Sequence, residues 1–122
     1  MSTLGIIAGG GELPFAIAES AAEAGRAVFV AAFGGIADRA VERFDHEWIS
    51  LGETGRMLSA LRQRGCTEIV LAGKVSRPKW SDIKLDAKAV LTLPKVVAAA
   101  RKGDDALLRS LVAIFESEGF RV

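Results

Sequence analysis

Cysteine, histidine and net charge are all scarce in this sequence of 122 residues. Cys66 is the only cysteine, which excludes an internal disulfide framework and a cysteine-rich zinc site and fits a reducing compartment such as the cytoplasm. His46, the only histidine, stands far along the chain from the glycine-rich segments, so we expect a structural or solvated role for it. The formal net charge of +1 creates no strong field that would attract nucleic acid or an anionic membrane surface.

Long hydrophobic runs are also missing. Charged residues interrupt the apolar stretches well before about 20 residues, the length that a helix needs to cross a bilayer. Residues 1–4 place no basic segment ahead of an apolar one, so we do not expect a secretory signal. These absences predict a soluble protein, although a soluble protein can still act on a lipid.

The sequence does contain a repeated alternation of short apolar runs and helical patterns. Strands are predicted over residues 4–8, 27–33, 47–51 and 67–72, and helices between Pro14 and Gly25, over 36–44 and 53–64, after Pro94, and from an N-cap at Asp104 to Gly119. Such alternation is typical of βαβ units, whose right-handed crossovers place helices on both faces of a parallel sheet. We therefore predict a single α/β domain over residues 1–122, a three-layer, Rossmann-like, doubly wound parallel sheet.

Two details of this fold can be predicted from the apolar pattern. The residues expected to be buried in the sheet are Ile6, Ile7, Val28, Val30, Ile69, Val70 and Leu71. Residues 120–122 resemble the opening of a fifth strand. A chain that ends just as a strand begins suggests that the native protein continues.

Three segments follow predicted strands and are candidates for a ligand site. They are residues 9–12 (GGGE), Gly34-Gly35 and Gly73-Lys74. In open α/β sheets, ligands bind beyond the carboxyl ends of the strands. We therefore expect the first and third segments, with Lys74 to Arg77, to lie side by side at one edge of the sheet.

The triple glycine favours a phosphate, because glycines let the backbone approach a ligand closely and a helix start directs N–H groups at it. The alternative is a tight turn without a ligand. The dinucleotide fingerprint is absent: Pro14 occupies the sixth position, and residues 31–33 end the second strand without a carboxylate for a ribose. We therefore expect no NAD.

Lys74 could neutralise a phosphate or could be a solvated lysine at a strand end. The segment is not a P-loop, since Glu68 and Val75 stand where that motif requires Gly and Ser or Thr. Asp104-Asp105 could hold a divalent cation, but two acids at a helix start are better explained as caps. Cys66 is expected to be a small packing residue, and Trp80 a packing anchor or an interface residue.

Four motifs in order resemble the LpxI-type family of UDP-2,3-diacylglucosamine pyrophosphatases. They are IIAGGGELP over residues 6–14, GKVSRP over 73–78, GDDALLR over 103–109 and FESEGF over 115–120. The similarity extends over the whole chain. Members have two domains that enclose the substrate, so the resemblance implies that this chain is the N-terminal domain and that the C-terminal catalytic domain, with its catalytic aspartate, is absent from it.

The resemblance also implies an activity and its setting. Water would attack the diphosphate of UDP-2,3-diacylglucosamine, releasing UMP and lipid X, with a divalent metal ion such as magnesium or manganese, in the cytoplasm of Gram-negative bacteria. The protein could contact the inner membrane through its lipid substrate and could form a homo-oligomer. A non-catalytic nucleotide- or sugar-phosphate-binding module is the alternative function.

Five residues match the family motifs and follow predicted strands at the expected cleft. These substrate-binding candidates are Gly10, Gly11, Glu12, Lys74 and Arg77. No catalytic residue is assigned to this chain, because no Ser-His-Asp arrangement, pair of catalytic carboxylates or metal-ligand cluster can be defended from its sequence.

Overall fold

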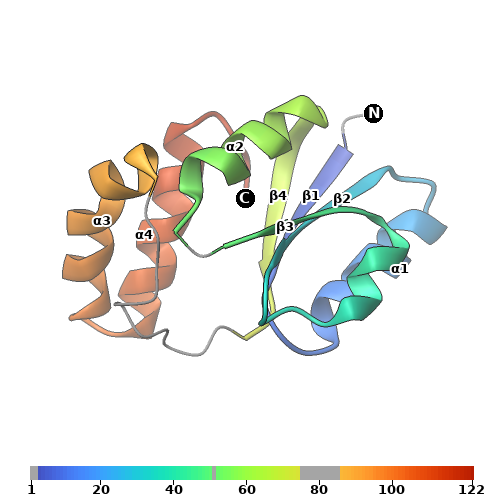
Figure 1. Cartoon of the computed structure of the whole chain (residues 1–122), viewed down its shortest axis with the longest axis horizontal. Coiled ribbons are helices and arrows are strands. Elements are labelled where there is room, and N and C mark those ends of the chain that lie inside the picture. Colours follow the sequence, from blue (N-terminus) through green and yellow to red (C-terminus); the bar gives the residue numbers. More distant parts are fainter. Residues whose placement is uncertain (1–2, 51, 75–85) are drawn as a thin grey trace.

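The computed structural model describes residues 3–50, 52–74 and 86–122, which form a parallel sheet flanked by helices (Figure 1). Its strands are β1 (Thr3–Ala8), β2 (Val28–Phe33), β3 (Asp45–Ile49) and β4 (Cys66–Ala72). Their order in the sheet is β3-β2-β1-β4, and every neighbouring pair is parallel. The predicted class, an α/β domain with a doubly wound parallel sheet, is confirmed.

The helices lie on both faces of the sheet and make three layers. They are α1 (Leu13–Glu23), a 3-10 helix η1 (Arg39–Arg43), α2 (Thr54–Gln63), α3 (Ala87–Ala100) and α4 (Asp104–Ser117). On one face, Ile6 and Val30 pack with Ala18 of α1 and Val41 of η1. On the other, strand residues pack with α2 and with Phe115 of α4. Helix α3 packs chiefly on α4 and α2 (Figure 1).

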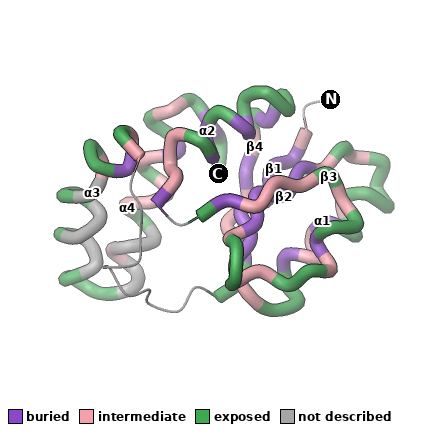
Figure 2. Tube along the Cα trace, viewed as in Figure 1, coloured by how far each residue is buried: buried purple, intermediate pink, exposed green. Residues whose placement is uncertain are grey.

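The buried residues are concentrated in the strands and in the helix faces that cover them (Figure 2). Of the seven residues predicted to be buried, four are buried: Ile6, Ile7, Val30 and Ile69. Val28, Val70 and Leu71 are only partly buried. Val28 opens its strand, and β4, which carries the other two, pairs with a full strand on only one side within the described sheet.

The predicted helix over residues 36–44 is wrong, because only the 3-10 helix η1 forms there. Asp38 has an extended backbone, and its carboxylate accepts a hydrogen bond from the Ala40 N–H at 2.9 Å. An extended capping residue cannot also continue a helix through its own position. The following strand accordingly begins at Asp45, two residues earlier than predicted.

The helix predicted after Pro94 begins earlier, and Pro94 lies inside it. Its start is fixed by Asp86, whose carboxylate accepts the Ala89 N–H at 2.9 Å. Helix α4 begins at Asp104, so the cap position belongs to Gly103, with φ of 116°, and not to Asp104. The side chains of Asp104 and Asp105 lie outside what the structure describes.

The predicted opening of a fifth strand appears at Arg121, which bridges Glu68 of β4 in parallel. The Arg121 N–H donates to Thr67 O, and the Ile69 N–H donates to Arg121 O, both at 2.8 Å. Its guanidinium also pairs with the Glu68 carboxylate at 2.7 Å. Among the described residues, no helix has the length and apolar character needed to cross a membrane.

Candidate functional site

The strand order places a change of direction between β1 and β4. From β1 the chain winds outward to β2 and β3, and it then returns to add β4 on the other side of β1. At such a switch point the loops after the two adjacent strands diverge, and ligands bind in the crevice outside their carboxyl ends. The loops after β1 and β4 are the predicted segments, residues 9–12 and Gly73-Lys74.

These two loops lie side by side, as predicted. The Gly10 N–H donates to Lys74 O at 2.7 Å, and the Lys74 N–H donates to Gly10 O at 2.9 Å. The Gly9 N–H continues the pattern by donating to Ala72 O at 2.8 Å. The backbones are therefore joined like two short strands (Gly10 and Lys74 form an antiparallel bridge). Arg77, the fifth candidate, lies outside the described residues.

Two of the glycines are required by this pairing. A Cβ atom on Gly9 would lie 2.7 Å from Lys74 O, and one on Gly73 would lie 2.7 Å from the Gly9 carbonyl carbon. Gly73 also has φ of 97°, a conformation that L side chains rarely adopt. These glycines allow the two loops to touch. This packing explains why glycine is present at both positions, without any role in ligand binding.

Gly11 differs, because its environment is open. A Cβ atom there would meet nothing within 4 Å, and φ is 93°. The next residue, Glu12, is exposed and makes no side-chain cap, while its carbonyl accepts the Ala16 N–H at 3.0 Å and so starts α1. The first turn of a helix directs N–H groups outward, and these favour an anion. Gly11 and the start of α1 thus form an accessible edge that suits an anion, although Pro14 in the first turn has no N–H to donate.

Lys74 is exposed beside this edge. Its backbone is fixed by the two hydrogen bonds to Gly10, which leaves the ammonium on a flexible stem next to the glycine loop. The arrangement can bring a positive charge and helix-start N–H groups to the same phosphate.

The third predicted segment also reaches this edge. A Cβ atom on Gly10 would lie 3.0 Å from Ile36 O and 3.4 Å from Lys74 O, so the loops after β1, β2 and β4 meet at Gly10. Beyond Gly34-Gly35 lies a shallow hollow over the ends of β2 and β3. Its lining residues are Gly34, Gly35, Ala37, Arg39, Glu42 and Trp48.

The sequence did not single out Arg39, Glu42 or Trp48 as site residues. Trp48 is the second-to-last residue of β3, whereas the predicted strand over residues 47–51 placed it near the strand's start, so no signal in the sequence pointed to it. The Arg39 Nε donates to Glu42 Oε1 at 3.0 Å. This hydrogen bond, with the charge of Glu42, raises the pKa of Arg39, so the guanidinium keeps its charge.

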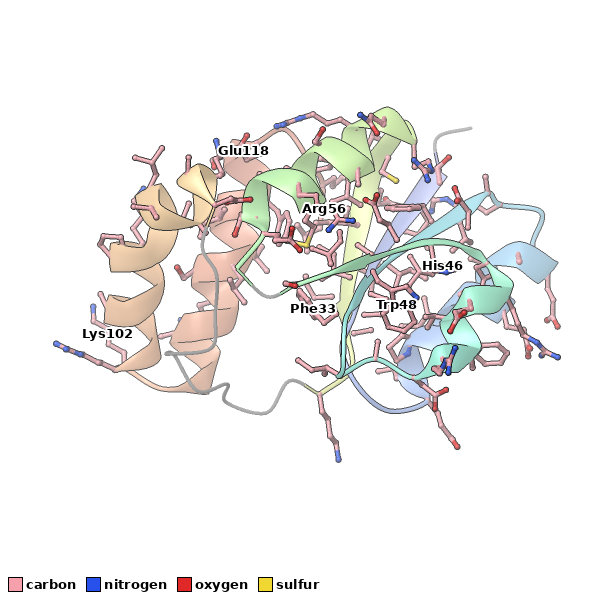
Figure 3. The ribbon with its side chains drawn as sticks, viewed as in Figure 1. Phe33, His46, Trp48, Arg56, Lys102 and Glu118 are labelled. Carbon is pink, nitrogen blue, oxygen red and sulfur yellow. The ribbon has the colours of Figure 1, made fainter. Side chains whose placement is uncertain are left out.

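Of the other residues considered in the sequence, His46 and Cys66 are held by packing and hydrogen bonds within the fold. His46 Nδ1 lies 2.8 Å from Phe44 O, and the His46 ring meets Trp48 edge-on at 6.2 Å (Figure 3). Cys66 is buried, and burial raises the pKa of its thiol, which disfavours the reactive thiolate. Trp80 lies outside the described residues. Within the described ranges, no three His, Cys, Asp or Glu side chains gather as a metal site.

Known proteins similar to this chain agree with the resemblance seen in its motifs. The LpxI N-terminal domain family matches residues 3–122. The UDP-2,3-diacylglucosamine pyrophosphatase LpxI of Caulobacter vibrioides is 44% identical over all 122 residues. Those residues cover 44% of that protein, so the chain spans less than half the length of this curated relative. On the family match and this identity, the chain belongs to the family of LpxI N-terminal domains.

Proposed function

We propose that this chain is the substrate-binding N-terminal domain of a hydrolase that cleaves the diphosphate of UDP-2,3-diacylglucosamine. The products would be UMP and lipid X, the 2,3-diacylglucosamine 1-phosphate of lipid A biosynthesis. The observation that carries the proposal is the 44% identity, over every residue of the chain, to a protein of that name. The glycine loop and Lys74, paired at the switch point of the sheet, supply the matching chemistry for a diphosphate.

Each candidate residue receives a role that suits its chemistry. Gly10 and Gly11 let a phosphate approach the backbone and the start of α1, and Lys74 offsets its negative charge. The Glu12 carboxylate accepts hydrogen bonds and repels anions, so its proposed partner is a hydroxyl or amide of the substrate. Arg77 stays a candidate for a second cationic contact on the strength of its motif alone.

The hydrolysis step needs more than these groups. Water attack on a diphosphate requires positioning of the two reactants and stabilisation of the charge that develops on the phosphoryl oxygens. Backbone N–H groups and Lys74 stabilise charge from one side of the substrate. We assign the carboxylate that activates water to a C-terminal domain, as in the two-domain organisation that the family resemblance implies.

A divalent ion, magnesium or manganese, is also part of the proposal, because a metal ion neutralises charge on diphosphate oxygens. The described residues do not gather the ligands for one.

We also propose that the reaction takes place in the cytoplasm of a Gram-negative cell, at the surface of the inner membrane when the lipid substrate is engaged. The single cysteine, which is free and buried, fits a reducing compartment. UDP-2,3-diacylglucosamine supplies the membrane contact through its acyl chains.

The test is a product analysis of the complete protein, in which this domain is joined to the C-terminal domain. It is incubated with UDP-2,3-diacylglucosamine and, in parallel, with UDP-N-acetylglucosamine, which has the same nucleotide but no acyl chains of the lipid type. We expect UMP and lipid X from the first and little UMP from the second. Binding of the lipid substrate without any hydrolysis would instead support the alternative, a nucleotide- or sugar-phosphate-binding module.

A further inference from the structure

Gly11, the start of α1 and Lys74 together are called the phosphate edge. The shallow hollow over the ends of β2 and β3 lies next to the phosphate edge but is separate from it. The Gly34 N–H donates to Ile49 O at 3.0 Å, which fixes this loop to the end of β3. Trp48 stands in register with Ala32 of β2, on the sheet face covered by α1 and η1. The helix that starts at the glycine loop covers the same face. A ligand held at the glycine loop can therefore extend into the hollow without crossing the sheet.

Trp48 provides a flat aromatic surface in the hollow. It is partly buried, packs on the core beneath α1 and η1, and meets the edge of the His46 ring at 6.2 Å (Figure 3). Gly34 and Gly35, which line the same hollow, leave space, since a Cβ atom on either would meet nothing within 4 Å. A partly buried aromatic ring beside open backbone is suited to stacking with a nucleobase.

The polar groups of the hollow match the edge of a uracil. Arg39 supplies N–H donors and Glu42 supplies carboxylate acceptors, and the two are already paired at 3.0 Å. Uracil presents one N–H donor between two carbonyl acceptors, so both partners of the pair find a complementary group. Both side chains lie at the surface, with 89% of Arg39 and 37% of Glu42 exposed, so a ligand can reach them.

We propose that this hollow is the nucleoside subsite, in which Trp48 stacks on the base and Arg39 and Glu42 contact its edge. The inference rests on the proposed function, because that function supplies the uridine nucleotide. The two sites are linked at Gly10, where a Cβ atom would lie 3.0 Å from Ile36 O of the β2 loop. The diphosphate at the glycine loop then connects directly to the nucleoside over β2, and the sugar extends toward Lys74.

The test is an NMR titration of this chain with UMP and, separately, with ribose 5-phosphate, which keeps the sugar and phosphate but lacks the base. The backbone amides of Gly10, Gly11, Gly34 and Gly35 and the indole N–H of Trp48 are followed. We expect both ligands to shift Gly10 and Gly11. Only UMP should shift Gly34, Gly35 and the Trp48 indole, and UMP should bind about tenfold more tightly because of base stacking.

Gly34→Leu is the matched variant, because its φ is not positive and its Cβ direction is open. It should fill the hollow, keep the fold and reduce UMP affinity to that of ribose 5-phosphate. Ala16→Leu is the control, since exposed Ala16 lines a separate hollow formed with Leu4 and Ser20. It should leave UMP affinity unchanged.

The pattern of signals that UMP shifts distinguishes the nucleoside subsite from the phosphate edge. UMP that shifts Gly10 and Gly11 but not Gly34 or Trp48 would overturn the nucleoside subsite and leave the phosphate edge intact. UMP that shifts none of these signals would overturn both. If the Trp48 and Gly34 shifts appear but the complete protein does not hydrolyse UDP-2,3-diacylglucosamine, the subsite stands and the proposed function fails.

Discussion

At the scale of single residues, the glycines of the site have different roles although they look alike in the sequence. Gly9 and Gly73 allow two backbones to touch, and Gly11 adopts positive φ at an open surface. Gly34 has neither a close backbone contact nor a positive φ, and the space beside it is open. A glycine cluster in a strand-to-helix loop is therefore a mixture of packing residues and ligand-facing residues, which only the neighbouring atoms distinguish.

Gly9→Ala tests the packing role. The new Cβ atom would lie 2.7 Å from the Lys74 carbonyl oxygen, so the β1 and β4 loops must separate. We expect the free energy of unfolding, measured by urea denaturation, to fall by about 1–3 kcal/mol. Gly34→Ala is the control and should change it by less than about 0.5 kcal/mol. Equal stability of the two variants would show that the loop contact is not needed.

Lys74→Ala in the complete protein tests the ligand-facing role. A lost charge-assisted hydrogen bond costs about 1.5–3 kcal/mol, which corresponds to roughly a tenfold to hundredfold loss of kcat/KM for UDP-2,3-diacylglucosamine. The loss appears in KM if the lysine binds substrate and transition state equally, and also in kcat if it acts in the transition state. Because Lys74 is exposed, the melting temperature should not change. Unchanged kinetics would make Lys74 a bystander.

At the scale of elements, helices α2, α3 and α4 are joined by a few charged side chains. The Asp86 carboxylate accepts N–H groups of Gly55 at 2.7 Å and Arg56 at 3.3 Å, and also that of Ala89 at 2.9 Å. One aspartate thus caps the starts of both α2 and α3. Glu118, after α4, binds Arg62 of α2 and Lys88 of α3.

Asp86→Ala removes the cap of two helices at once. A lost cap typically costs about 0.5–2 kcal/mol, so we expect a loss of about 1–3 kcal/mol in the free energy of unfolding. Asp38→Ala, which removes a single hydrogen bond at the short η1, should cost less. Urea denaturation of the two variants provides the comparison. A smaller effect for Asp86 than for Asp38 would contradict the shared cap.

The Glu118 cluster predicts a pH dependence. Hydrogen bonds from Lys88 and Arg62 lower the pKa of Glu118 below its ordinary value of 4.5. A carboxylate with a lowered folded-state pKa stabilises the fold above its unfolded pKa, and this contribution is lost as the pH falls through the lowered value. The melting temperature of the unmodified chain should therefore fall on acidification below about pH 4.5. This fall should be smaller in the Glu118→Gln variant.

Part of the fall in melting temperature at low pH should remain in the Glu118→Gln variant, because the pKa values of Glu53 and Glu68 are lowered as well. Glu68 accepts hydrogen bonds from Arg121 and Arg26, and Glu53 accepts them from the Ser50 N–H and Arg56. An acid drop of the same size in Glu118→Gln and in the unmodified chain would show that the cluster contributes nothing.

Most elements could be predicted from the sequence. Buried parallel strands are continuous apolar runs, and such runs can be recognised directly in the sequence. The helix over residues 36–44 and the late start after Pro94 were wrong for a common reason. Asp38 and Asp86 set the local backbone through side-chain hydrogen bonds, which periodicity does not record. Pro94, which is exposed and lies inside α3, was likewise not a reliable signal for the start of that helix.

The pairing of the glycine loop with Lys74 could also be predicted, because the carboxyl ends of parallel strands lie at one edge. The hollow lined by Arg39, Glu42 and Trp48 could not be predicted from the sequence. Trp48 reaches the carboxyl end of the sheet because β3 runs from Asp45 to Ile49, and Arg39 and Glu42 lie on η1, which replaces the expected helix.

At the scale of the whole molecule, the candidate groups for binding a phosphate lie at one edge of the sheet, where the loops after β1 and β4 are paired. The curated relative is more than twice as long as this chain. We therefore expect this domain to bind and orient UDP-2,3-diacylglucosamine while the bond-breaking groups come from the C-terminal domain.

The most direct test of this account is a phosphorus NMR time course of UDP-2,3-diacylglucosamine hydrolysis, run with magnesium or manganese. Equal concentrations of this chain and of the complete protein are compared. We predict that the complete protein converts the diphosphate signals into those of UMP and lipid X, and that this chain leaves them at the background rate. Turnover by this chain close to that of the complete protein would contradict the account.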